Sequence, residues 1–142
     1  MIYIMNIRSE TEMAQFAENF AKSLHLPATI VLTGDVGAGK TTFTRALATT
    51  LGVTEPVTSP SFTISKRYAL PTGGELVHYD FYRLDDPGLM AEDLAEAIQA
   101  PGSLTVIEWG QDILNLVPEN AHFLTFAIND DGSRTITEGV PA

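Results

Sequence analysis

Eight consecutive residues in the first third of the chain have the types and spacing of a phosphate-binding loop. The run Gly34-Asp35-Val36-Gly37-Ala38-Gly39-Lys40-Thr41 matches the Walker A pattern, Gly-x-x-x-x-Gly-Lys-Thr. The glycines allow successive backbone N–H groups to turn toward phosphate oxygens, and a helix that starts there presents its positive N-terminal end. Lys40 can reach the β- and γ-phosphates, and Thr41 supplies a hydroxyl for magnesium. We therefore expect nucleotide binding by Asp35, Val36, Gly37, Ala38, Gly39, Lys40, Thr41 and Thr42.

Two acidic residues end strand-like runs and are candidates for the metal and the attacking water. Glu108 closes the apolar run 104–107, and Asp80 ends the run 75–80. The carboxyl ends of parallel strands meet at the edge of the sheet where such a loop binds its ligand. We expect Glu108, together with Thr41, to hold magnesium directly or through water and to orient the nucleophile. Asp80 is expected either to support this arrangement or to couple it to the loop around Ser59-Pro60, and the predicted catalytic residues are Glu108, Asp80 and Lys40.

Two further residues are close to these carboxylates in the sequence. Trp109 directly follows Glu108, and for a sole tryptophan both core packing and support of the site remain open. His78 precedes Asp80 by two residues and therefore shares its strand face. We interpret His78 as a partly exposed strand histidine without a role in proton transfer.

Several subclasses of nucleotide-binding protein are disfavoured by missing motifs. The chain has no Asn-Lys-x-Asp loop, which guanine specificity would require. Residues 85–88 match the Asp-x-x-Gly switch motif, but their place before a predicted helix fits a helix cap better than a switch. The five arginines are scattered, which argues against the arginine-bearing lid of a small-molecule kinase. None is an obvious arginine finger, so we expect slow hydrolysis that a partner accelerates. A nucleotide-gated interaction module and a small-molecule kinase remain alternatives.

The segments that must position these residues alternate between strand and helix patterns. Helices are expected after the capping box Ser9-x-x-Glu12, from the glycine loop to Gly52, and between Asp86-Pro87 and Pro101. Strands are expected over residues 2–7, 28–32, 62–70, 75–84, 104–108, 121–128 and 133–140. This order predicts a three-layer α/β P-loop NTPase fold. The sheet is expected to be mixed but mostly parallel, with a C-terminal hairpin, in one domain over residues 1–142.

Composition predicts where in the cell the protein acts and which partners it binds. The chain has 142 residues, 8 basic against 18 acidic side chains, a net charge of −10 and no cysteine. Its apolar runs are much shorter than the ~20 residues of a membrane span. These features predict a soluble cytoplasmic protein without a membrane partner. The negative charge disfavours direct binding to a nucleic-acid backbone, so any action on RNA is expected to pass through partners.

Four motifs, in this order and in a chain of this length, resemble the TsaE (YjeE) family over essentially the whole sequence. They are the glycine loop with Thr42, Thr58-Ser59-Pro60-Ser61-Phe62, the seven residues 78–84 (His-Tyr-Asp-Phe-Tyr-Arg-Leu), and Ile107-Glu108-Trp109. The resemblance implies an ATPase needed for bacterial synthesis of threonylcarbamoyladenosine, the modified base beside the anticodon of certain tRNAs. It also implies TsaD-like and TsaB-like partners, with the TsaD subunit performing the threonylcarbamoyl transfer.

The resemblance also assigns roles to individual residues. Lys40 and Thr41 match the family's phosphate and magnesium positions, Glu108 matches its metal-site glutamate, and Asp80 and Trp109 match its other site residues. Together with the base preference argued above, this makes ATP and Mg²⁺ the expected ligands.

Two terminal positions and one loop follow from the same resemblance. Thr58, Ser59 and Ser61 fall in the family's switch-like loop, with Ser61 where threonine is common. Thr11 and Arg134 fall where the family's terminal segments approach the adenine, and a guanidinium can stack on that ring.

Overall fold

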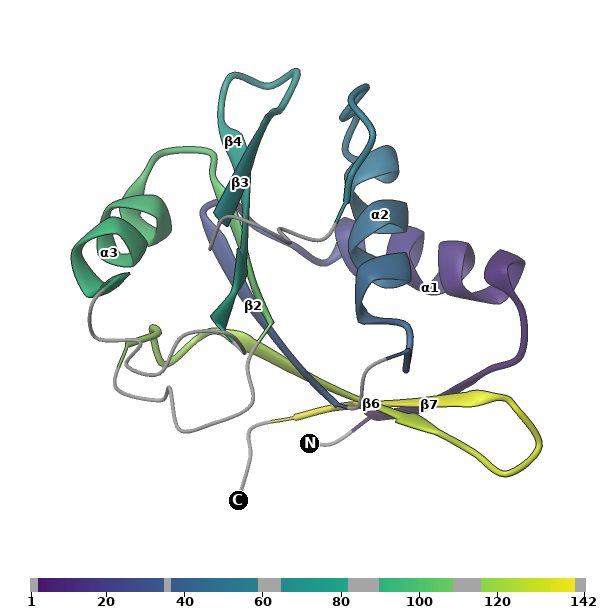
Figure 1. The fold of residues 1–142 in the computed structure, drawn as a ribbon. Helices are drawn as coiled ribbons and strands as arrows, with labels where there is room; N and C mark the ends of the chain where they lie inside the picture. The colour runs from purple at the N-terminus through teal and green to yellow at the C-terminus, as the bar shows by residue number, and fades with distance from the viewer. Residues whose placement is uncertain (1–2, 35–36, 59–64, 82–89, 109–115, 140–142) are drawn as a thin grey trace.

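The chain folds around a seven-stranded β-sheet that is flanked by helices (Figure 1). The computed structural model describes residues 3–34, 37–58, 65–81, 90–108 and 116–139. Within these ranges the strand order is β1-β7-β6-β2-β5-β4-β3. The strands are β1 (Tyr3–Ile7), β2 (Ala28–Gly34), β3 (Ser65–Ala69), β4 (Glu75–Asp80), β5 (Leu104–Glu108), β6 (His122–Ile128) and β7 (Arg134–Glu138).

The four central strands, β6, β2, β5 and β4, run parallel to one another. The pairs β1–β7, β6–β7 and β3–β4 at the two sides of the sheet are antiparallel. The expected mixed sheet and C-terminal hairpin are therefore confirmed, and the parallel part is the part that contains β2. Because β2 lies between β5 and β6, its carboxyl end is at the centre of one edge of the sheet.

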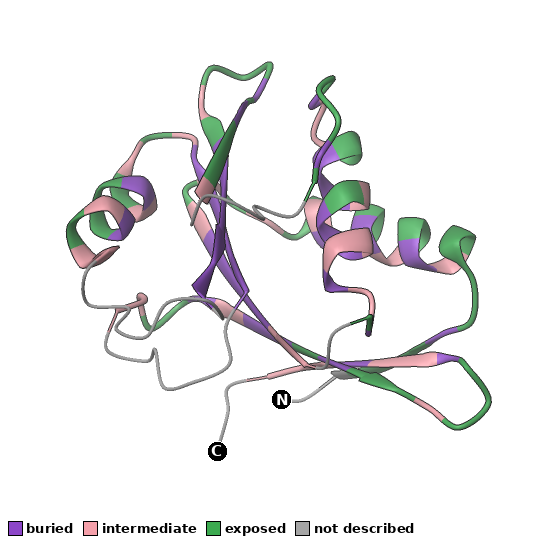
Figure 2. Cartoon of the chain, viewed as in Figure 1, coloured by how far each residue is buried: buried purple, intermediate pink, exposed green. Residues whose placement is uncertain are grey.

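Helices cover the two faces of the sheet unequally. Figure 1 shows α1 (Glu10–Lys22) and α2 (Lys40–Thr50) on one side and α3 (Ala91–Gln99) on the other, which confirms the three layers. Apolar side chains of α1, α2, β2, β5 and β6 form one core on the first face. A smaller core gathers under α3 on the second face. Figure 2 shows that burial is concentrated in the central strands and on the helix sides that face them.

Local signals explain where two of the helices begin and end. The Ser9 hydroxyl accepts a hydrogen bond of 3.1 Å from the backbone N–H of Glu12, which is one half of the predicted capping box. Helix α2 ends just before Gly52, whose φ of +93° suits a residue after a helix. The predicted cap at Asp86-Pro87 lies outside the described residues, as do parts of the strands expected over residues 62–70 and 75–84.

A buried tyrosine fastens α3 to the sheet. The Tyr79 hydroxyl of β4 donates a 2.5 Å hydrogen bond to the Asp93 carboxylate of α3, and Arg67 of β3 pairs with the other oxygen of Asp93 at 3.2 Å. Burial, followed by the bond to Asp93, raises the pKa of Tyr79 above its ordinary value. One aspartate thus joins two strands and a helix.

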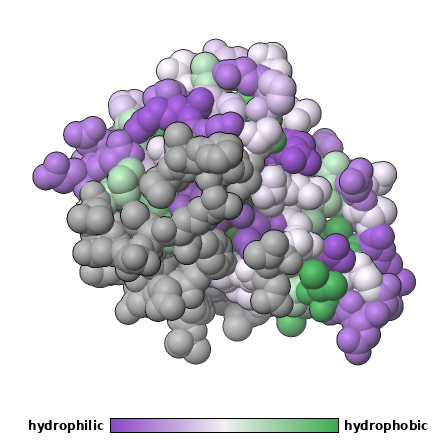
Figure 3. Space-filling model, viewed as in Figure 1, coloured by the Kyte–Doolittle hydropathy of each residue, from purple (hydrophilic) through white to green (hydrophobic). Residues whose placement is uncertain are grey.

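The described surface is mainly polar. Figure 3 shows hydrophilic side chains over most of the visible described face. Among the residues that the structure describes, the large apolar side chains that stay exposed are Ile4, Met5 and Ile128, all on β1 or β6. No helix in the described ranges is both long and apolar enough to cross a membrane.

Candidate functional site

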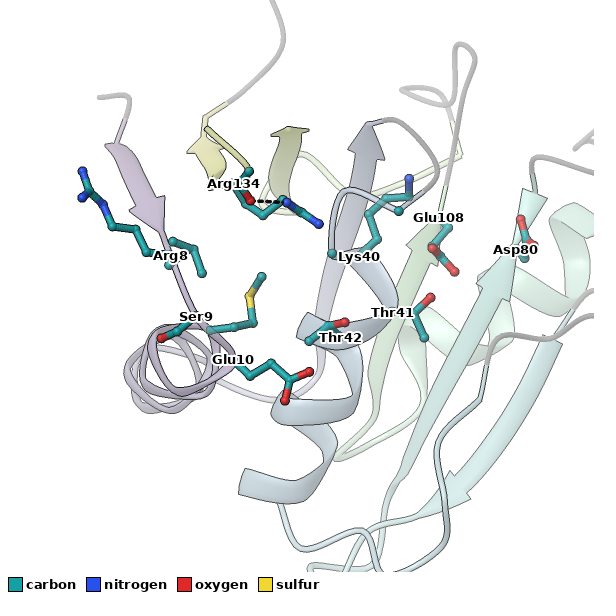
Figure 4. A pocket seen from close by; sticks show the side chains of 14 residues that line it. Arg8, Ser9, Glu10, Lys40, Thr41, Thr42, Asp80, Glu108 and Arg134 are labelled. Atoms are coloured by element: carbon teal, nitrogen blue, oxygen red, sulfur yellow. Dashed lines mark hydrogen bonds between the residues drawn. The ribbon is translucent and has the colours of Figure 1, made fainter. Parts of the chain in front are cut away.

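A cavity of about 520 Å³ lies where β2, β4 and β5 end and α2 begins. Figure 4 shows the side chains around it, which come from elements far apart in the sequence. The lining residues are Ile7, Arg8, Ser9, Glu10, Met13, Gly37, Gly39, Lys40, Thr41, Thr42, Asp80, Glu108, Gly132 and Arg134. Its size suits a ligand of nucleotide dimensions.

The described glycines between β2 and α2 have the positive φ angles that the Walker A pattern predicts. Gly34, the last residue of β2, has a φ of +134°, and an added Cβ would overlap the carbonyl oxygen of Phe126 on β6. Gly39 immediately precedes α2 with a φ of +107°, and no side chain caps the helix there. Amide groups at such a helix end are oriented toward an anion. Within the part of the loop that the structure describes, the geometry therefore suits a phosphate.

Lys40 is fixed at the start of α2 and is 7% exposed. Its ammonium donates a 2.5 Å hydrogen bond to the backbone oxygen of Gly34, so the side chain lies over the loop that precedes it. Thr41 is the next residue, and Figure 4 shows its hydroxyl turned toward Glu108. The cationic group and the hydroxyl that the Walker A pattern calls for therefore line one cavity.

The two carboxylates lie side by side on the opposite wall. Asp80 and Glu108 are register partners on the parallel strands β4 and β5, and they are 9% and 6% exposed. Leu76 and Leu104, at even spacing along the same two strands, belong to the core under α1 and α2. Both carboxylates therefore emerge on the sheet face from which α2 rises.

The oxygen donors of the site fit magnesium bound together with a nucleotide. The described residues contain no group of three or more His, Cys, Asp or Glu side chains that could hold a metal by themselves. Magnesium is commonly held by one or two carboxylates and completes its octahedron with phosphate oxygens and water. The Thr41 hydroxyl, Asp80 and Glu108 supply donors of this kind, and thiolate or imidazole ligands are not needed.

His78 is the clearest departure from the sequence analysis. The interpretation as a partly exposed strand histidine is wrong, because its side chain is 0% exposed and its Nε2 lies 2.9 Å from Oε2 of Glu108. Its spacing to Asp80 correctly placed it on the cavity side of β4. The depth of burial could not be inferred, because it depends on the pairing of β4 with β5 and on the core beneath α2.

The other end of the cavity is formed by the N-terminal segment and the C-terminal hairpin. Arg134 lines it, with Nη1 donating a 2.5 Å hydrogen bond to the backbone oxygen of Gly132. Thr11 does not line the cavity, whereas Glu10 and Met13 of the same helix do. Arg8 is a lining residue that the sequence analysis did not single out, and no local motif marks it. The adenine contacts expected of Thr11 and Arg134 remain predictions.

The remaining predicted residues are either away from the cavity or outside the described ranges. Thr58 is not a lining residue; its hydroxyl accepts a 2.6 Å hydrogen bond from Lys66, and its backbone contacts the Tyr68 hydroxyl. Arg45 of α2 donates to the backbone oxygen of Val57 at 3.2 Å, so this segment is attached to the helix that follows the glycine loop. Asp35, Val36, Ser59, Ser61 and Trp109 lie outside the described residues.

Comparison with known protein families identifies the group to which these features belong. The family model described as "Threonylcarbamoyl adenosine biosynthesis protein TsaE" matches residues 7–136. The chain belongs to the TsaE family. The matched region contains the glycine loop, both carboxylates and all of the residues that line the cavity.

Similar proteins from two other bacteria belong to the same family. A Streptomyces coelicolor protein named tRNA threonylcarbamoyladenosine biosynthesis protein TsaE is 41% identical over 100 residues, or 70% of this chain and 68% of the relative. A Rickettsia bellii TsaE of the same name is 35% identical over 130 residues, covering 90% and 88% of the two chains.

A solved structure has the same fold. The crystal structure of YdiB from Bacillus subtilis superposes with a TM-score of 0.78 over 97% of this chain and 84% of that one, at 29% sequence identity. The fold is therefore shared along nearly the whole chain.

Proposed function

We propose that this protein binds Mg-ATP and hydrolyses its β–γ bond, and that it does so as the accessory ATPase of threonylcarbamoyladenosine synthesis. The observation that carries the proposal is the convergence of Lys40, Thr41, Asp80 and Glu108 from three separate elements on one cavity beside the glycine loop. Membership of the TsaE family supports the biological setting. The whole chain acts as one cytoplasmic domain in this proposal.

Each described residue has a distinct task in the proposed hydrolysis. Loop amides and the N-terminus of α2 bind the phosphates, and Lys40 neutralises charge on the β- and γ-phosphates. Thr41 and Glu108 would hold magnesium, which when bound neutralises charge that develops on the phosphate oxygens. Glu108 also accepts a hydrogen bond from the attacking water, with Asp80 beside it to restrict the water's position. Catalysis then rests mainly on positioning and electrostatics.

Of the two arginines that line the cavity, we propose that Arg134 faces the base rather than the transferred phosphate. In Figure 4 Arg8 and Arg134 lie on the β1 and β7 side of Lys40, whereas Glu108 and Asp80 lie on its other side. Arg134 is the candidate for stacking on adenine. Since neither guanidinium is beside the carboxylates, we expect slow turnover by the isolated protein and stimulation by a partner.

The proposed role in tRNA modification depends on partners. With 18 acidic and 8 basic residues, the chain is poorly suited to bind a polyanion directly. TsaD-like and TsaB-like proteins would hold the tRNA and transfer the threonylcarbamoyl group. ATP binding and hydrolysis by this protein would allow repeated rounds of that reaction.

The decisive experiment combines calorimetry with phosphate release. Wild-type protein should bind ATP in the presence of Mg²⁺ and release phosphate without a phosphorylated acceptor. Lys40→Ala should retain the fold, judged by circular dichroism, and bind ATP at least 10-fold more weakly. Lys22→Ala is a matched control, because Lys22 is an exposed lysine at the far end of α1. Equal ATP affinity in the wild type and the Lys40 variant would refute the proposed site.

A further inference from the structure

His78 is buried beside a residue that the proposed function places at the metal, although no motif argument gave the histidine a task. Its side chain has no exposed surface, and it lies on β4 two residues before Asp80. Its nearest polar partner is Oε2 of Glu108 on the neighbouring strand, at 2.9 Å. Burying an imidazole is unfavourable unless its polar atoms find partners, so this contact requires an explanation.

The chemistry of the two groups determines the direction of the hydrogen bond. An ionised carboxylate only accepts hydrogen bonds, so Nε2 of His78 carries the hydrogen and donates it to Oε2. For Oε1 of Glu108, the described residues provide no such partner, and Glu108 lines the cavity. The histidine thus restrains one carboxylate oxygen and leaves the other for groups in the cavity.

The second ring nitrogen of His78, Nδ1, argues against a role that is limited to filling space in the core. Among the described residues, Nδ1 is buried without a hydrogen-bond partner. An apolar side chain would fill the same space without an unsatisfied polar atom. The cost of burying Nδ1 is therefore tolerated for the bond that Nε2 makes.

We propose that His78 is a positioning residue that holds the Glu108 carboxylate in one orientation, with Oε1 directed to the magnesium and water of the proposed ATPase site. This inference rests on the proposed function. A glutamate has three rotatable side-chain bonds, and the site needs one of its oxygens in one place. A ligand that is fixed by a hydrogen bond from a neighbouring side chain keeps its position when the metal is absent. Loss of such a bond typically costs 10- to 100-fold in metal affinity or activity.

Three substitutions at one position separate the hydrogen bond from the shape of the side chain. His78→Leu keeps much of the volume and removes the donor. In His78→Gln the side-chain amide can present an N–H near the position of Nε2, whereas in His78→Asn it reaches only to the position of Nδ1. His122→Leu is the matched control, because His122 also lies 3.6 Å from a strand glutamate, Glu138, but outside the cavity.

The primary readout is the Mg²⁺ concentration that gives half of the full Mg²⁺-dependent increase in ATP affinity. This concentration is measured by calorimetry. We expect His78→Leu and His78→Asn to raise it at least 10-fold and to lower kcat 10- to 100-fold. ATP affinity without Mg²⁺ should stay within 2-fold of wild type, because the glycine loop is intact. His78→Gln should recover most of the loss, and His122→Leu should match the wild type.

A double-mutant cycle tests whether the histidine acts through Glu108. In a Glu108→Ala background, His78→Leu should no longer change the Mg²⁺ dependence. The inference is overturned if His78→Leu in the native background keeps the wild-type Mg²⁺ dependence, or if His78→Gln is as impaired as His78→Leu. If the leucine variant does not fold, the contrast between Gln and Asn decides in the same way. A wild-type protein without Mg²⁺-dependent ATP binding would instead refute the proposed function itself.

Discussion

Replacing Gly34 by alanine tests whether the end of β2 is built around the absence of a side chain. The φ of Gly34 is +134°, where residues other than glycine are strained by about 1–3 kcal/mol. An added Cβ would overlap the carbonyl oxygen of Phe126 and lie 3.0 Å from its carbonyl carbon, inside the ~3.5 Å of a favourable nonbonded contact. Phe126 is the register partner of Gly34 on β6, so relief of the overlap must separate the two strands.

The overlap should cost about as much as overpacking a core, which is roughly 1–3 kcal/mol. Together with the backbone strain, we expect the free energy of unfolding to fall by about 2–6 kcal/mol. For a domain of this size that corresponds to a Tm lower by roughly 5–20 °C. ATP affinity should also decrease, because the Gly34 carbonyl accepts the hydrogen bond from Lys40.

Gly73→Ala provides the matched control for backbone strain. Gly73 lies in the turn between β3 and β4 with a φ of +105°, and an added Cβ would meet no atom within 4 Å. Guanidinium unfolding at equilibrium should therefore show a smaller loss for Gly73→Ala, with ATP affinity unchanged. Equal unfolding free energies for the two variants would refute the reasoning, because the overlap with Phe126 is the feature that distinguishes them.

Three further predictions address the chemistry, the packing and the partners. Glu108→Gln should keep the ATP affinity within about 3-fold of wild type and lose most of the single-turnover hydrolysis. An unchanged hydrolysis rate would assign the chemistry to Asp80. Full activity in tRNA modification without ATP hydrolysis would favour the nucleotide-gated module. Tyr79→Phe should lower the free energy of unfolding at neutral pH by about 1.5–3 kcal/mol, since it removes a hydrogen bond to the charged Asp93. The raised pKa of Tyr79 means that the folded protein keeps a proton which the unfolded chain loses above about pH 10. Wild-type stability should thus fall more steeply than that of the variant above that pH in chemical denaturation. Alone, the protein should bind tRNA negligibly in filter binding at physiological salt, and Lys40→Ala should stop repeated threonylcarbamoyl transfer in a reconstituted system; undiminished multiple turnover without the protein would remove the proposed biological role.

Features that depend on neighbouring residues could be predicted from the sequence. The capping box at Ser9 and the glycine after α2 mark helix ends because their interactions span only a few residues. The strand expected over residues 104–108 has the bounds of β5, since a strand buried on both faces is a continuous apolar run. The three-layer α/β fold followed from the order of these local patterns.

Features that depend on strand order could not be predicted in the same way. No local pattern shows that the C-terminal hairpin and β1 extend the sheet beyond β2, and this arrangement brings Arg8 and Arg134 to the same cavity. The burial of His78 likewise follows from the register of β4 against β5. Lys40 and Thr41 were identified by their motif, and Asp80 and Glu108 by their places at the ends of strand patterns, whereas Arg8 and the buried His78 required the three-dimensional arrangement.

The position of β2 between β5 and β6 also has a consequence for the order of events during synthesis on the ribosome. The nascent chain emerges from its N-terminus, so β2 and the glycine loop leave the ribosome well before either strand that pairs with β2. Until residues 104–108 have emerged from the ribosome, the backbone of β2 lacks both of its sheet neighbours, and Glu108 cannot reach the cavity. The nucleotide site therefore cannot be assembled progressively as the chain lengthens. It must form late, after β5 can pair with β2, and a chain that is released early would expose an unpaired apolar strand.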